Sequence, residues 1–354
     1  MPYESIELSM ISLTAFISFF ITLMVEKNSE KIFKGALLDQ DFLKPQAFHK
    51  KPIARSGGLA SILSLMIFFI LSFFLLNIKY TDYFLIGFSF FVLGFLDDLK
   101  ININPYTRLL LMIFILSFNI VFFSIQILSL DFIILEELLI NDFFSYLFIL
   151  LCFLFIINGA NLIDGFNGLL TIHLIIINII LFLINLNTET IELVLILATQ
   201  IIILICFLLF NFPKSKMFLG DSGSYLFGSL VALNIINTNN LNPQISSFFF
   251  CILLFYLFFE VFFSFFRKLY LKKSPLKPDD MHLHMLLYKA LDSSKKFKDS
   301  NYLNSIVINS IFLFLIIPSI YFRENGLICR YWFFSLLIAY IIFYFQLNKN
   351  FQKN

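Results

Sequence analysis

Two adjacent aspartates, Asp97 and Asp98, end an apolar run in the segment Gly-Phe-Leu-Asp-Asp-Leu-Lys. A carboxylate is costly to desolvate, so acids at the edge of a membrane span mark working sites by default. Successive residues of a helix point about 100° apart. We therefore expect the two carboxylates to do different jobs, one facing a cavity and the other bonding to a neighbouring helix or a basic side chain. A polar collar at the end of a helix is the structural alternative.

A second polar island has the sequence Asn-Leu-Ile-Asp-Gly-Phe-Asn-Gly. Asn161 and Asp164 are three residues apart and so share a helical face, and Asn167 lies one such step further on. Amides combined with carboxylates suit the recognition of a nucleobase or the shaping of a metal site. Close helix packing with internal hydrogen bonds is the alternative.

A third island, Phe-Leu-Gly-Asp-Ser-Gly-Ser, places Asp221 at the start of an apolar run. Gly and Ser at such a position can open a helix whose free N–H groups attract phosphate. A carboxylate there is also a good ligand for the hard cation Mg²⁺. An ordinary helix cap is the alternative.

Basic residues and histidines lie near these islands. Arg55 precedes a pair of glycines, where it can clamp a phosphate or simply anchor a span on the positive-inside rule. His282 and His284 share a face only in extended chain, and they can either bind a metal or donate to a diphosphate. Glu260 and Arg267 are about two helical turns apart, so both a structural ion pair and a site-facing acid fit Glu260.

Together these parts suit a substrate rich in phosphate. Carboxylates recruit a divalent cation, and dispersed basic side chains such as Lys100 and Arg108 neutralise the remaining charge. The same mixture is typical of phosphoryl-transfer sites, where the protein mainly positions reactants and spreads charge. A site at the membrane edge further indicates that one substrate is a lipid phosphate and the other a cytosolic nucleotide sugar.

The composition indicates the class of protein that must position these residues. The chain of 354 residues is 60% hydrophobic and 14% charged, with a mean hydropathy of +0.90. Its apolar runs approach the ~20 residues that cross a bilayer, and they do not alternate. We therefore expect an all-α polytopic membrane bundle that forms a single domain over residues 1–354. The net charge of +2 gives no reason to expect a nucleic-acid partner.

Eleven spans are predicted, of which 223–236 is the shortest. The stretch 129–142 is either a loop or an interfacial helix. Acids at Glu4 and Glu7 precede the first apolar run and favour a retained span over a cleaved signal. The predicted spans cover residues 7–26, 58–77, 81–96, 108–128, 143–160, 169–186, 191–210, 223–236, 245–266, 303–322 and 327–347.

The orientation follows from Lys and Arg, which are in excess in cytoplasmic loops. With the N-terminus outside, all of the 25 basic residues except Lys79, Arg323 and Arg330 fall on the inner side. An odd number of spans then places the C-terminus in the cytoplasm. The same topology puts every polar island and the long loop 267–302 at the cytoplasmic face, although the motifs played no part in choosing it.

The motifs GFLDD, NLIDGFNGL, FLGDSGS and PDDMHLH, with HKKPIARSGG upstream, resemble those of the polyprenyl-phosphate N-acetylhexosamine-1-phosphate transferases of glycosyltransferase family 4. The resemblance is strongest over residues 49–290, and several motifs in one order are specific where one alone is weak. It implies a multi-pass enzyme of the bacterial cytoplasmic membrane. Such an enzyme transfers a sugar 1-phosphate from a UDP-sugar to undecaprenyl phosphate, releases UMP, and starts a cell-envelope glycan such as peptidoglycan or lipopolysaccharide O-antigen.

The resemblance also implies a cofactor and roles for the acidic pair. The cofactor is Mg²⁺, with Mn²⁺ as the alternative. Asp97 matches an acid that activates the lipid phosphate, and Asp98 matches its partner, which supports the site or the metal. Asp221 matches a magnesium ligand.

The remaining positions match family segments that bind substrate. Asn161, Asp164 and Asn167 match the segment that lines the nucleotide and metal region, and Arg108 and Glu260 match polar positions. His282 and His284 match a H-x-H-H motif that is linked to the diphosphate and the sugar.

Two positions depart from the family pattern. Asn167 stands where many members carry Asp, and Met285 replaces the last His of H-x-H-H, so a role that needs that His cannot be carried over. The H-x-H form is more similar to the UDP-N-acetylhexosamine group than to the muramoyl-pentapeptide translocases. It therefore favours UDP-GlcNAc or a related sugar.

An ion-coupled secondary transporter is the alternative from another class, because buried acids and broken spans also suit transport. A transporter should carry its acids near the bilayer midplane and show related halves. Here the acids gather at one face, and the sequence shows no internal repeat. A non-catalytic scaffold is a third interpretation. The oligomeric state is open, with a homodimer as one alternative.

Overall fold

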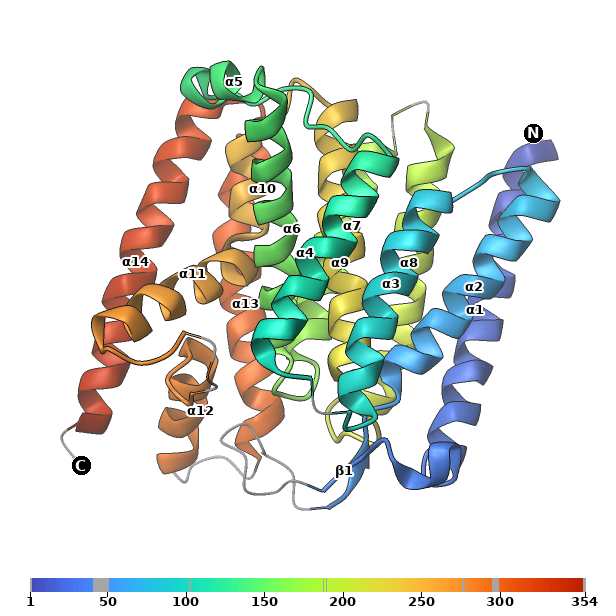
Figure 1. The fold of residues 1–354 in the computed structure, drawn as a ribbon, viewed down its shortest axis with the longest axis horizontal. Helices are drawn as coiled ribbons and strands as arrows, with labels where there is room; N and C mark the ends of the chain where they lie inside the picture. The colour runs from blue at the N-terminus through green and yellow to red at the C-terminus, as the bar shows by residue number, and fades with distance from the viewer. Residues whose placement is uncertain are drawn as a thin grey trace.

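The computed structural model describes residues 2–40, 51–101, 103–186, 188, 190–275, 277, 279–294 and 299–352. His49 and Lys50 of the upstream basic motif lie outside this part of the chain. Figure 1 shows a bundle of helices with the two termini at opposite ends. The described strands, β1 (Leu38–Asp39) and β2 (Ile53–Ala54), form a small antiparallel pair at the end of the bundle opposite the N-terminus.

The helices follow one another with short connections. The first half of the chain contains α1 (Pro2–Asn28), the 3-10 turn η1 (Ile32–Gly35), α2 (Gly57–Leu76), α3 (Thr81–Asp98), α4 (Pro105–Phe122), α5 (Ile133–Leu139), α6 (Asp142–Ile163) and α7 (Leu169–Asn185). The second half contains α8 (Ile191–Asn211), α9 (Gly220–Leu241), α10 (Ser247–Leu253), α11 (Phe255–Tyr270), α12 (Leu283–Ser293), α13 (Ser300–Tyr321) and α14 (Gly326–Gln352).

The chain is an α-helical, multi-pass membrane protein, as predicted. Among the described residues, seven helices are long and apolar enough to cross a membrane, namely α1, α2, α4, α6, α8, α13 and α14. An eighth crossing is counted if α10 and α11 form one broken span. Ten of the eleven predicted spans each overlap a single helix, and 245–266 covers two helices, but the number of eleven crossings and the orientation of the termini stay predictions.

The segment predicted as one span over 245–266 is not a single straight helix. It forms α10 and α11, which meet at an angle of 74°. Glu260, Ser264 and Lys268 are four residues apart and buried, so α11 carries one polar face along its length. The bend lets that face contact the segment that follows α11. Part of this segment, predicted as a loop over 267–302, forms α12.

Helix α9 lies at the centre of the bundle and packs against α2, α3, α6 and α7. Nearly all of its residues are buried, although many are Ser, Thr, Asn or Gly. Their polar groups bond to neighbouring helices. Asn234 donates to Asn178 and to Gln200, at 3.1 and 2.9 Å, and Asn185 donates to Thr238 at 2.9 Å. Because α9 contacts protein instead of lipid, it needs no apolar surface. For this reason hydropathy predicts only a short span, 223–236, within α9.

Glycines let three helices approach one another at the start of α9. A Cβ on Gly94 of α3 would stand 2.3 Å from the carbonyl oxygen of Asp221. A Cβ on Gly58 of α2 would stand 2.3 Å from the hydroxyl of Ser222. The ends of α2 and α3 are therefore fixed against the first turn of α9 at backbone contact distance.

We predict that Gly94→Ala separates α3 from α9 and lowers the free energy of unfolding by about 1–3 kcal/mol, the usual cost of overpacking. Thermal unfolding in detergent measures this change. Gly165→Ala is the matched control, since a Cβ there would meet no atom within 4 Å. Equal midpoints for the two variants would contradict the close packing.

Candidate active site

The side chain of Asp98 accepts the first hydrogen bonds of α9. Its carboxylate accepts from the backbone N–H of Asp221 at 3.0 Å and from that of Ser222 at 2.9 Å, and the Ser222 hydroxyl donates at 2.6 Å. Asp98 is 2% exposed. A carboxylate at a helix N-terminus satisfies unpaired N–H groups and opposes the positive end of the dipole. The expectation that these two N–H groups bind phosphate is therefore wrong, because Asp98 already occupies them.

The turn before α9 is shaped for this contact. Gly220 has φ +78°, in the left-handed region that favours glycine. A Cβ there would stand 2.6 Å from an oxygen of Asp98. Asp164, the residue directly after α6, accepts from the backbone N–H of Gly220. Two carboxylates from α3 and α6 thus hold the start of one helix.

Asp221 lies in the first turn of α9 and is only partly buried. Asn161 in the last turn of α6 donates to its Oδ1 at 3.0 Å and to the Ser224 hydroxyl at 3.1 Å. Asn161 and Asp164 do not share a helical face as expected, because Asp164 follows the end of α6 with ψ 56°, but both reach the start of α9. Burial and the nearby charge of Asp221 raise the pKa of Asp164 to about 7. Acidic side chains are therefore gathered around Asp221.

Among the described residues, Arg55 is a cation that lies beside these acidic side chains. Its Nη1 is 3.8 Å from Oδ1 of Asp221 and 3.9 Å from Oδ1 of Asp98. Asp39 of β1 fixes the guanidinium by accepting from Nε at 3.0 Å and Nη2 at 2.7 Å. The pairing of β1 with β2 and a bridge from Ala54 to Met217 carry Arg55 to the start of α9. These contacts favour the interpretation of Arg55 as a residue of the site over its interpretation as a positive-inside anchor.

Asp97 points away from Asp98, as the helical geometry predicted. Its Oδ2 accepts from Nη1 of Arg108 on α4 at 2.9 Å. Arg108 also interacts electrostatically with Asp221, so this ion pair borders the same cluster. Lys100 is exposed and has φ +61°. None of the ion pairs found in the described part of the chain involves it.

Asn167 does not continue the helical face of Asn161, so that expectation is wrong. Helix α6 ends at Ile163, and the chain then turns. The side chain of Asn167 donates to the carbonyl of Pro213 at 2.9 Å, and its backbone N–H donates to Asn301 at 2.9 Å. These contacts hold the turn against neighbouring segments.

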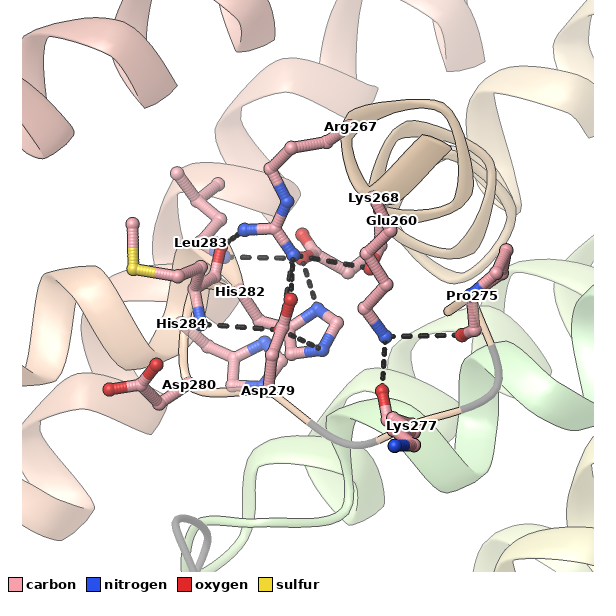
Figure 2. A network of polar contacts seen from close by, with 12 residues as sticks. Glu260, Arg267, Lys268, Pro275, Lys277, Asp279, Asp280, His282, Leu283 and His284 are labelled. Carbon is pink, nitrogen blue, oxygen red and sulfur yellow. Dashed lines mark hydrogen bonds and ion pairs between the residues drawn. The ribbon is translucent and has the colours of Figure 1, made fainter. Parts of the chain in front are cut away.

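A second polar cluster surrounds His282, and Figure 2 shows it from close by. Glu260 of α11 accepts from Nδ1 of His282, 3.0 Å away, and from the backbone N–H of Leu283 at 3.1 Å. Nε2 of His282 lies 3.2 Å from Asp279, and Asp279 accepts two hydrogen bonds from Arg267 at 3.1 and 2.8 Å. Glu260 therefore pairs with His282 and not with Arg267.

The last helix completes this cluster. Tyr340 of α14 donates to Glu260 at 2.5 Å, and Arg267 donates to the hydroxyl of Tyr344 at 2.7 Å. Lys268 donates to the carbonyls of Pro275 and Lys277 at 3.2 and 2.7 Å (Figure 2). The histidine segment is thus held by α11 on one side and α14 on the other.

His284 differs from His282 in what its ring contacts. Its Nδ1 lies 3.1 Å from the Tyr256 hydroxyl, and its buried Nε2 has no hydrogen-bond partner among the described residues. Burial lowers the pKa of His284 to about 3. The two rings stack with centroids 5.5 Å apart, although His282 is extended and His284 is helical. Of the two histidines, His284 is the one whose ring keeps a buried nitrogen without a hydrogen-bond partner among the described residues.

Phe166 connects the two clusters. It lies two residues after Asp164, and its ring centroid is 5.8 Å from that of His284. The structure therefore brings Arg55, Asp97, Asp98, Arg108, Asn161, Asp164 and Asp221 together, with Glu260, His282 and His284 in an adjoining group. Sequence reasoning did not identify Asp39, Asp279 or the α14 tyrosines as parts of these groups. The acids flanking the histidines and two tyrosines one helical turn apart were the available signals.

The residues around Asp221 fit a Mg²⁺ ion that is held jointly by protein and substrate. Within the described part of the chain, no three His, Cys, Asp or Glu side chains form a ready metal cage. Mg²⁺ seldom needs one, since it is usually held by one or two carboxylates together with waters and substrate phosphates. The partly buried Asp221 beside Asp164 supplies such a donor set, whereas Asp98 has both oxygens engaged by α9.

A cavity of about 350 Å³ lies between the start of α3 and the ends of α4 and α9. Its lining includes Lys79, Asp82 and Asn237. It is therefore at the other end of α3 and α9 from the acidic cluster. None of the predicted site residues lines it.

The chain is similar in sequence to several known proteins. Residues 80–239 match the family described as glycosyl transferase family 4. The chain is 25% identical over 92% of its length to the undecaprenyl-phosphate alpha-N-acetylglucosaminyl 1-phosphate transferase of Thermotoga maritima, of which it covers 92%. It is 28% identical over 67% of its length to a Bacillus subtilis protein named "Probable undecaprenyl-phosphate N-acetylglucosaminyl 1-phosphate transferase", of which it covers 66%.

A shorter match relates part of the chain to a second kind of transferase. Over 22% of its length it is 40% identical to the phospho-N-acetylmuramoyl-pentapeptide-transferase of Leuconostoc mesenteroides, of which it covers 25%. The resemblance predicted from the ordered motifs is confirmed by these matches.

We predict that Asp98→Asn destabilises the protein by about 3 kcal/mol, because the amide presents a donor to buried N–H groups that need an acceptor. Thermal unfolding in detergent measures the loss. Asp142→Asn is the matched control, since the Asp142 carboxylate also lies at a helix N-terminus, in the first turn of α6, but is exposed. A midpoint for Asp98→Asn equal to that of the control would rule out the cap.

We predict that Tyr340→Phe lowers the free energy of unfolding by about 1.5–3 kcal/mol, the range for a hydrogen bond to a charged group. The change removes only the hydroxyl that donates to Glu260. Tyr331→Phe on the same helix is the control, because Tyr331 is 67% exposed. If both variants unfold at the wild-type midpoint, α14 does not stabilise the histidine segment through Glu260.

Proposed function

We propose that this chain, whose residues 80–239 are those of a glycosyl transferase family 4 protein, transfers N-acetylhexosamine 1-phosphate from a UDP-sugar to undecaprenyl phosphate and releases UMP. GlcNAc is the proposed sugar, since two relatives that match most of the chain carry N-acetylglucosaminyl in their names. The observation that carries the proposal is the junction at α9, where Asp221 stands beside Asn161 and Arg55. Nothing among these relatives supports the transporter alternative.

The reaction moves a phosphoryl group between two oxygens. An oxygen of the lipid phosphate forms a bond to the phosphorus that carries the sugar, and the bond from that phosphorus to UMP breaks, with the electron pair leaving on UMP. A phosphate monoester has a second pKa near ~6, so most of the nucleophile is already ionised at neutral pH. The main demand on the protein is therefore to bring two anions together.

The described residues meet that demand with cations placed by acids. Arg55, held by Asp39, and Arg108, held by Asp97, flank Asp221. Fixed guanidinium groups can bind phosphate oxygens through two parallel hydrogen bonds. The role of Asp97 in activating the lipid phosphate stays a prediction, and its ion pair adds a second role, the orientation of Arg108.

In this proposal Asp221 and Asp164 hold Mg²⁺ together with the substrate diphosphate, and Asp98 acts by fixing α9. When bound, Mg²⁺ supplies further neutralisation of phosphate charge. In the same proposal the unpartnered Nε2 of His284 contributes to substrate binding, and His282 is fixed by Glu260 and Asp279. The positive-inside charge pattern supports a location in the bacterial cytoplasmic membrane with the site facing the cytoplasm.

We expect purified protein to release UMP when it is given UDP-GlcNAc, undecaprenyl phosphate and Mg²⁺. Chromatographic detection of UMP measures turnover, and a panel of UDP-N-acetylhexosamines identifies the sugar. Omission of the lipid phosphate is the negative control. Failure to release UMP with every sugar of the panel would overturn the proposed function.

Asp221→Asn separates the metal role from the fold in the same assay. We expect turnover to fall by about a hundredfold or more, since even outer-shell changes at metal sites cost 10–100-fold. The unfolding midpoint should stay near that of the wild type, because Asp221 caps no helix through its side chain. Wild-type turnover in this variant would remove Asp221 from the metal role.

A further inference from the structure

Tyr225 carries a buried hydroxyl that no group in the described structure satisfies. The side chain belongs to α9 and is 0% exposed. Its hydroxyl has no hydrogen-bond partner among the described residues. Buried polar groups in folded proteins nearly always have a partner, because an unpaired one loses its hydration without compensation. The hydroxyl therefore needs an explanation that the fold does not supply.

The surroundings of Tyr225 indicate what the missing partner is. Tyr225 follows Asp221 by four residues and so lies one turn further along the same face of α9. The charged groups that act on it are Asp221, Arg108, Asp97 and Asp98. Tyr225 and Asp97 both interact electrostatically with Arg108. Tyr225 therefore lies close to the Asp97–Arg108 ion pair.

This arrangement pairs a guanidinium with a neutral donor. Arg108 gives one terminal nitrogen to Asp97, and its planar fork carries further N–H groups. A phosphate oxygen that binds to Arg108 would accept a second hydrogen bond from the nearby hydroxyl of Tyr225. An anion fits there better than a cation, because a phenol donates readily and is a poor ligand when neutral.

Resting on the proposed function, we propose that Tyr225 is a substrate-contacting residue whose hydroxyl donates to a phosphate oxygen held by Arg108. The phosphate belongs either to the polyprenyl phosphate or to the diphosphate of the nucleotide sugar. Both present the same oxygens to the same two donors. The two sources differ in which Michaelis constant depends on the hydroxyl.

The test compares Tyr225→Phe with Thr199→Val. Thr199 of α8 also carries a fully buried hydroxyl for which the described residues offer no partner, but it belongs to neither polar cluster. Each substitution removes one such hydroxyl and keeps the shape of the side chain. Both variants should unfold at or above the wild-type midpoint, since neither loses a hydrogen bond within the protein.

Loss of a hydrogen bond to a charged phosphate should raise one KM, or lower kcat, by about tenfold or more in Tyr225→Phe. A raised KM for undecaprenyl phosphate assigns the lipid phosphate, and a raised KM for UDP-GlcNAc assigns the diphosphate. A lowered kcat alone assigns a contact to the phosphoryl group during transfer. Thr199→Val should match the wild type in all three constants.

Wild-type constants in Tyr225→Phe, or the same loss in Thr199→Val, would overturn the inference. A second readout distinguishes this failure from failure of the proposed function. Undecaprenyl phosphate or UDP-GlcNAc should raise the unfolding midpoint of the wild type, and Tyr225→Phe should lose that shift for the ligand it contacts. If neither ligand shifts the wild type and no UMP is released, the proposed function itself fails.

Discussion

The capping of α9 by the buried carboxylate of Asp98 is the interaction on which the rest of the site depends. It joins the end of α3 to the start of α9 through two backbone N–H groups and the Ser222 hydroxyl. Because Asp98 satisfies the helix end, the neighbouring Asp221 is left to face Arg55 and Asn161. Asp98 therefore caps the helix, and this leaves Asp221 in position for the proposed ligand.

The close approach of three helices makes this cap geometrically feasible. Gly58, Gly94 and Gly220 remove the side chains that would separate α2, α3 and α9 at this point. The central position of α9 has a second consequence, since its polar residues bond to α7 and α8 and do not meet lipid. Precise placement of Asp221 and Tyr225 thus follows from how a polar helix is buried inside a membrane bundle.

Local signals predicted the helices and the acids but not their partners. Hydropathy located ten of the eleven spans each on a single helix, and the 100° step between residues predicted the different directions of Asp97 and Asp98. Periodicity could not predict that α6 ends before Asn167 or that α11 bends away from α10, because both depend on contacts with distant segments. The pairing of Tyr340 with Glu260 spans 80 residues of sequence and has no local signature.

The central claim is that the acidic cluster becomes a cation site only when a diphosphate completes it. Thermal unfolding of the wild-type protein with Mg²⁺ alone, UDP-GlcNAc alone and both together tests this claim most directly, because a ligand that binds the folded state raises its stability. The account predicts that the two ligands together raise the midpoint by more than the sum of their separate effects. Additive shifts, or a full shift with Mg²⁺ alone, would contradict it.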